Sequence, residues 1–176
     1  LESIADEVLT PMHMALGDED TSAELLLSTG HAQGNTLAPE MVDLFPDVFV
    51  DQSDASRETV TIRRLDTVFA EERLDFMKID VEGFEMELLR GAASVLDRTP
   101  PRAVQIELYD HQVAPVAEML KRWYPHAWRG VIAKQSGKLT LLPLGVEPSK
   151  TIHRAILPPV YIFTLTDPYV DGVLTA

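Results

Sequence analysis

The spacing of apolar residues predicts an alternation of strands and helices along the chain. Apolar positions recur at helical spacing in three segments, and short apolar runs typical of strands occur in seven others. The predicted helices are residues 1–9, 84–96 and 113–123, and residues 65–69 are expected to form a turn or a short helix. The predicted strands are residues 12–16, 23–27, 59–62, 74–81, 103–108, 139–144 and 161–165.

The order of these elements predicts an α/β fold. Residues 74–81 and 103–108 are nearly continuous in apolar character and each is followed by a helix, as in a parallel sheet covered on both faces. Two further strands, 139–144 and 161–165, follow with little helix between them. We therefore expect a mostly parallel sheet that ends in an antiparallel C-terminal strand pair. Residues 28–56, rich in Gly, Pro, Asn, Asp and Ser, are expected to be irregular, and such long excursions are often functional.

The composition narrows the class of protein. A chain of 176 residues, 45% apolar and 24% charged, fits one soluble globular domain. The net charge of −13 disfavours nucleic acid and anionic membrane surfaces as partners. The absence of cysteine excludes disulfides, thiolate zinc sites and cysteine nucleophiles. We see no signal peptide, and residues 155–165 are too short to span a bilayer, so we expect a cytoplasmic protein.

The residues that carry chemistry are Lys78-Ile79-Asp80-Val81-Glu82-Gly83. Asp80 and Glu82 stand at the carboxyl end of a buried strand, where open α/β sheets bind their ligands. Gly83 suits a tight turn into the following helix. Acids in this place also serve as helix caps or first-turn charges, so spacing alone leaves a ligand site and a capping role equally open.

A resemblance favours the ligand site. Residues 74–85, LDFMKIDVEGFE, and then Leu88-Leu89-Arg90-Gly91-Ala92, resemble the signature of FkbM-type methyltransferases. Three other stretches resemble family features: Ala15-Leu16-Gly17-Asp18, the Leu65-Asp66 that ends a lead-in strand, and Ile106-Glu107 at the end of the next strand.

The resemblance implies a class I (Rossmann-like) methyltransferase fold and transfer of a methyl group from S-adenosylmethionine to an oxygen. The acceptor would be a hydroxyl of a sugar or another secondary metabolite, a small molecule or glycan. Asp80, Glu82 and Glu107 would be catalytic, with Lys78 as a structural partner. The cofactor would contact Ala15, Leu16, Asp18 and Asp80.

The sequence also departs from the family pattern. Family members carry a Gly-Ala-Asn-x-Gly-like loop after their first strand and an acid after their second, and neither is present here. The chain starts at Leu1, within a predicted helix. We therefore expect one N-terminally truncated methyltransferase-like domain, which alone binds cofactor weakly or not at all and is inactive.

Two other functions remain open from the sequence. One is a non-catalytic methyltransferase-like module that binds a partner or a glycan. The other is an acidic site for a divalent metal ion on Asp80, Glu82 and Glu107, although no histidine pair has the spacing of metal ligands. The intact Lys-Ile-Asp-x-Glu-Gly run favours the enzyme.

Overall fold

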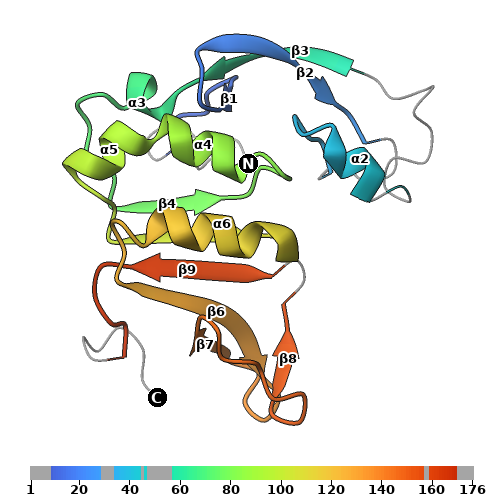
Figure 1. The fold of residues 1–176 in the computed structure, drawn as a ribbon, viewed down its shortest axis with the longest axis vertical. Helices are drawn as coiled ribbons and strands as arrows, with labels where there is room; N and C mark the ends of the chain where they lie inside the picture. Colours follow the sequence, from blue (N-terminus) through green and yellow to red (C-terminus); the bar gives the residue numbers. More distant parts are fainter. Residues whose placement is uncertain (1–8, 29–33, 45, 47–56, 157–158, 170–176) are drawn as a thin grey trace.

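Two β-sheets, with short helices beside them, make up the described part of the chain (Figure 1). A computed structural model describes residues 9–28, 34–44, 46, 57–156 and 159–169. The helix predicted at residues 1–9 lies, apart from its last residue, outside the described residues, as does much of the predicted irregular region. No helix within the described ranges is both long enough and apolar enough to cross a membrane.

The larger sheet has the strand order β4-β5-β9-β6-β7, and β8 also pairs with β6. Its strands are β4 (Phe76–Ile79), β5 (Ala103–Glu107), β6 (His126–Ala133), β7 (Leu139–Pro143), β8 (His153–Ala155) and β9 (Val160–Thr164). Of the neighbouring pairs in this sheet, β4 and β5 run parallel, and the pairs that involve β6 or β9 are antiparallel. The fold is thus mixed α/β.

The expectation of a mostly parallel sheet is therefore wrong. Strand β9 returns between β5 and β6, and β7 follows β6 through the short connection 134–138, which can join only antiparallel neighbours. The two late strands do not pair with each other, because each pairs with β6. Strand β6 was not predicted, since His126, Arg129 and Gly130 interrupt its apolar pattern.

The smaller sheet has the order β1-β3-β2. It comprises β1 (Ala15–Leu16), β2 (Thr21–Leu26) and β3 (Arg57–Arg63), with β1 parallel and β2 antiparallel to β3. Figure 1 shows it at the β4 side of the larger sheet, with β7 and β8 at the opposite end. Helix α2 (Glu40–Leu44) lies within the region that was expected to be irregular, so this part of the expectation is wrong.

The remaining helices are α3 (Leu65–Val68), α4 (Glu85–Gly91), α5 (Ala93–Arg98) and α6 (Asp110–Leu120). The helix predicted at residues 84–96 is divided at Ala92, and two contacts explain the break. Gly91 packs so tightly that an added Cβ would lie 1.8 Å from the carbonyl oxygen of Gly17. The Asp66 Oδ1 atom accepts a hydrogen bond from the Val95 amide at 2.9 Å and so caps the start of α5.

The core lies between the larger sheet and helices α4, α5 and α6. Its fully buried side chains include Leu89 and Leu96 from α4 and α5, Val104 and Ile106 from β5, and Val116 from α6. Because these side chains fix β4 and β5 against the helices, the loops at the carboxyl ends of both strands start from a rigid base.

Candidate active site at the carboxyl end of β4

A pocket of about 470 Å³ lies between the carboxyl end of β4 and the smaller sheet. Ala15 and Leu16 of β1 line one side, and Lys78 and Asp80 line another. Further lining comes from apolar side chains, among them Leu25, Leu37 and Phe84. Three residues predicted to contact a cofactor, Ala15, Leu16 and Asp80, therefore share one pocket.

Asp80 is linked to Glu107 through Lys78. The Lys78 Nζ atom lies 2.7 Å from Asp80 Oδ2 and 3.5 Å from Glu107 Oε1. The hydrogen bond to Asp80 and the charges of both acids raise the pKa of Lys78, although its partial burial opposes this rise. Lys78 therefore remains an ammonium at neutral pH.

Glu107 is the more buried of these two acids, with a side chain that is 21% exposed against 37% for Asp80. Burial is the main cause that raises the pKa of Glu107, and the charge of Asp80 adds to it. Lys78 acts in the opposite direction but does not cancel the rise. Glu107 does not line the pocket itself and stands one strand away, at the end of β5.

Glu82 has an unusual backbone conformation. Its φ of 48° lies in the left-handed region, which residues other than glycine rarely adopt. Thr36 Oγ1 donates a hydrogen bond to the Glu82 carbonyl oxygen at 2.5 Å, and Tyr109 OH donates to Glu82 Oε2 at 2.7 Å. Strained residues of this kind cluster at functional sites, and here two distant segments hold the strain in place.

A different acid, Glu85 in the first turn of α4, closes the turn before this helix, and the N-cap residue Phe84 makes no side-chain cap. Glu85 is only 1% exposed; its Oε1 accepts from the Gly83 amide at 3.1 Å and its Oε2 from Gln112 Nε2 at 2.5 Å. Among the described residues, no backbone amide donates to the carboxylate of Asp80 or Glu82. These two side chains are therefore not occupied in finishing α4.

Asp18, the fourth predicted cofactor contact, is exposed and does not line the pocket. The acid that organises its turn is Asp20, which accepts hydrogen bonds from the Arg64 amide at 2.8 Å and from Thr67 Oγ1 at 2.9 Å. These two bonds lower the pKa of Asp20. The cofactor role of Asp18 stays a prediction.

Sequence reasoning missed Thr36, Glu85, Tyr109 and Gln112 as parts of this site. Tyr109 had a signal, because it follows β5 at the edge of the sheet where Glu107 ends the strand. Glu85 had one too, as the last acid of the Glu-Gly-x-Glu run. Thr36 had none, because it lies in a stretch without periodicity.

The metal-site hypothesis gains no support from this geometry. Within the described ranges, no group of three or more His, Asp or Glu side chains is arranged to hold a metal ion. The Lys78 ammonium lies between Asp80 and Glu107, where a divalent ion would have to bind.

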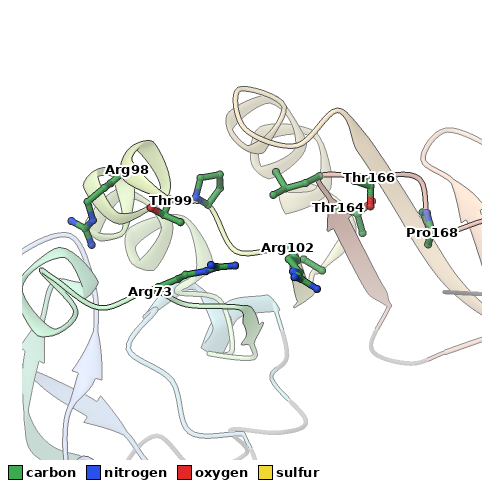
Figure 2. Close-up of a pocket in the computed structure, with 10 residues that line it drawn as sticks. Arg73, Arg98, Thr99, Arg102, Thr164, Thr166 and Pro168 are labelled. Atoms are coloured by element: carbon green, nitrogen blue, oxygen red, sulfur yellow. The ribbon is translucent and has the colours of Figure 1, made fainter. Parts of the chain in front are cut away.

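A second cavity, of about 910 Å³, lies at the opposite end of the sheet, where β4 and β5 begin (Figure 2). Arg73, Arg98 and Arg102 line it. Arg98 donates to the carbonyl oxygens of Phe69 and Glu72 at 3.1 and 3.4 Å, and Arg73 pairs with Asp75 at 3.3 Å. This cavity is remote from Asp80 along the strands and is not the predicted site.

Comparison with known proteins agrees with the signature at the β4 pocket. The family model described as the methyltransferase FkbM domain matches residues 2–150, most of the chain. No curated protein and no solved structure matches the chain. The matched region contains β4, β5 and every residue of the site described above. The chain therefore belongs to the FkbM methyltransferase family.

Proposed function

We propose that the protein is an S-adenosylmethionine-dependent O-methyltransferase that acts at the carboxyl end of β4. The observation that carries this proposal is the position of Asp80, whose carboxylate lines a pocket together with Ala15 and Leu16. Family membership supports methyl transfer, and the pocket supports the place where it occurs.

The chemistry of the pocket fits this cofactor. Apolar side chains such as Leu16, Leu25 and Leu37 suit a flat adenine ring, and the Asp80 carboxylate suits a sulfonium or ammonium charge. When bound, S-adenosylmethionine supplies an already activated methyl group. The protein then has to align the acceptor for in-line displacement and to receive its proton.

Asp80 is the carboxylate that lines the pocket, so it would either receive the proton or stabilise the sulfonium by its charge. Glu107, whose pKa is raised by burial and by Asp80, does not line the pocket and would act on the site through Lys78. Asp80 is also paired with Lys78. Lys78 would have a structural role, because its ammonium group pairs with both carboxylates and so fixes their positions.

We propose that Glu82, which is half-buried and does not itself line the β4 pocket, meets the acceptor beside the pocket. Its side chain is fixed by the Tyr109 hydroxyl and its carbonyl oxygen by Thr36, so its second carboxylate oxygen is presented in a defined direction. A carboxylate that accepts hydrogen bonds from hydroxyl groups suits a sugar or another polyol. We therefore propose a small-molecule or glycan hydroxyl as the methyl acceptor.

We propose that residues outside the β4 pocket bind the methionine end of the cofactor. The outer edge of β4 pairs with no other strand among the described residues, and the sequence has no glycine-rich loop of the family type. We propose that a further strand and its glycine loop join this edge in the complete enzyme, extending this single domain. Residues 1–176 alone would then be inactive.

Methyl transfer from isotopically labelled S-adenosylmethionine to a panel of sugars and hydroxylated metabolites tests the proposal. The full-length protein should label at least one hydroxyl acceptor. If it binds S-adenosylhomocysteine but labels nothing, the chain is a binding module. If it neither binds nor labels, the proposed cofactor site is wrong.

A further inference from the structure

A groove of about 680 Å³ lies between α6 and the strands β6 and β9, outside the β4 pocket. Its lining combines one buried phenol, Tyr161, one cation, Arg129, and two acids, Asp110 and Glu147. None of these side chains takes part in the proposed methyl transfer.

Tyr161 is 2% exposed as a whole residue, and its hydroxyl has no hydrogen-bond partner within the described part of the chain. The hydroxyl oxygen is not one of the fully buried atoms that lack a partner, so it opens into the groove, where a ligand can reach it. Burial raises the pKa of Tyr161, and the nearby charge of Arg129 opposes this rise. The phenol therefore keeps its proton at neutral pH and can donate it to a ligand.

Arg129 is next to Tyr161 in the sheet. The two residues are cross-strand partners of β6 and β9, so their side chains project from the same face. Arg129 is half-buried and forms neither an ion pair nor a hydrogen bond with the described residues. This distinguishes it from Arg73 and Arg98 in the cavity of Figure 2, whose guanidinium groups already have partners.

Together, the guanidinium and the phenol offer several N–H and O–H donors to one anionic group. A guanidinium matches the two oxygens of a carboxylate particularly well. Asp110 and Glu147 are exposed in the same groove and supply acceptors for hydroxyl groups. Two acids beside one arginine also disfavour a doubly charged phosphate, as does the net charge of −13.

We propose that this groove binds a small hydroxylated carboxylate, such as a sugar acid, with its carboxylate on Arg129 and Tyr161 and its hydroxyl groups towards Asp110 and Glu147. Val113 and Leu144 provide apolar surface for the carbon skeleton of the ligand. This binding site is separate from the β4 pocket, and the inference does not depend on methyl transfer.

Calorimetry with D-glucuronate and D-glucose as probes tests the proposal on the full-length protein without cofactor. The two sugars differ by the carboxylate. Glucuronate should bind at least about tenfold more tightly than glucose, the ratio expected for one charge-assisted hydrogen bond. Equal binding of the two sugars, or no binding of glucuronate, would overturn the proposal.

Variants locate the site. Arg129→Gln should abolish the preference for glucuronate over glucose, and Arg129→Lys should retain part of the affinity for glucuronate. Tyr161→Phe should lower the affinity for glucuronate by about tenfold. Arg154→Gln, which removes an exposed arginine from the neighbouring β8, is the matched control and should bind as the wild type does. Unchanged binding in folded Arg129→Gln or Tyr161→Phe, checked by thermal unfolding, would place the ligand elsewhere and refute the inference.

Discussion

At the carboxyl ends of β4 and β5, the Lys78 ammonium pairs with two carboxylates, those of Asp80 and Glu107. Both acids interact with the same cation, but the side chain of Glu107 is more buried than that of Asp80. The more buried Glu107 pays a higher cost for ionisation, and the more exposed Asp80 is the hydrogen-bonded partner of Lys78. We propose that this difference in burial gives the two carboxylates different roles.

The raised pKa of Glu107 predicts how stability depends on pH. Because the folded protein binds this proton more tightly than the unfolded chain does, stability falls as pH rises from the ordinary value of 4.5 through the raised value. Glu107→Gln removes that loss. Urea unfolding should therefore show the variant gaining stability relative to wild type between pH 4 and pH 8. Glu118→Gln, on the exposed face of α6, is the control for the loss of a carboxylate. If the stability difference between Glu107→Gln and wild type does not change with pH, the pKa of Glu107 is not raised.

Tyr109 is expected to position Glu82. The 2.7 Å hydrogen bond from its hydroxyl fixes the Glu82 carboxylate, and Tyr109→Phe removes this bond but keeps the ring. We expect kcat for methyl transfer to fall about tenfold, with a loss of only about 1 kcal/mol in stability. Tyr124→Phe is the matched control, because the Tyr124 hydroxyl is buried without a partner among the described residues. Equal kcat values for the two variants would remove Glu82 from the reaction.

At the scale of elements, the motif that identifies the family also builds the fold. In Leu88-Leu89-Arg90-Gly91-Ala92, the glycine lets α4 approach the backbone of the turn after β1. In Glu82-Gly83-Phe84-Glu85, the second acid closes the turn through the Gly83 amide. The lead-in acid Asp66 caps α5. Asp66, Glu85 and Gly91 are therefore structural positions of the motif, whereas Lys78 and Asp80 line the pocket.

Gly91→Ala tests this packing. The added Cβ would lie 1.8 Å from the Gly17 carbonyl oxygen, a backbone atom that cannot move alone, so we expect a loss of about 3 kcal/mol in the free energy of unfolding. Gly130→Ala is the control, since its Cβ would meet neighbours only at 3.4 Å and beyond. Similar unfolding midpoints in urea for both variants would show that α4 is not held against β1.

The sequence could predict those parts of the site that are adjacent in the chain. Residues 78–83 were placed correctly at the carboxyl end of a strand, because apolar character and the following glycine are local signals. The expectation that this strand is covered on both faces is wrong: β4 is an edge strand among the described residues, and Phe76 on its outer face is 55% exposed. The partners of these residues could not be predicted, since Thr36, Tyr109 and Gln112 reach the turn from 27 to 46 positions away. Strand β6 was missed for a similar reason: pairing with β7, β8 and β9 outweighs its weak apolar pattern.

At the scale of the whole molecule, the two ends of the larger sheet differ in charge. Asp80, Glu82 and Glu107 gather at the carboxyl ends of β4 and β5, whereas three arginines line the cavity at the amino ends (Figure 2). In a protein with a net charge of −13, the acidic end attracts a cationic ligand such as a sulfonium. The charge distribution thus agrees with the proposed place of the cofactor.

The most direct test of the account is to compare turnover and stability in Asp80→Asn of the full-length protein. The Asp80–Lys78 pair is exposed enough that its loss should change the free energy of unfolding by less than about 1 kcal/mol. If Asp80 faces bound cofactor and acceptor, methyl transfer should fall by about 100-fold or more. Unchanged turnover, or a fall in activity explained by an equal loss of folded protein, would contradict the account.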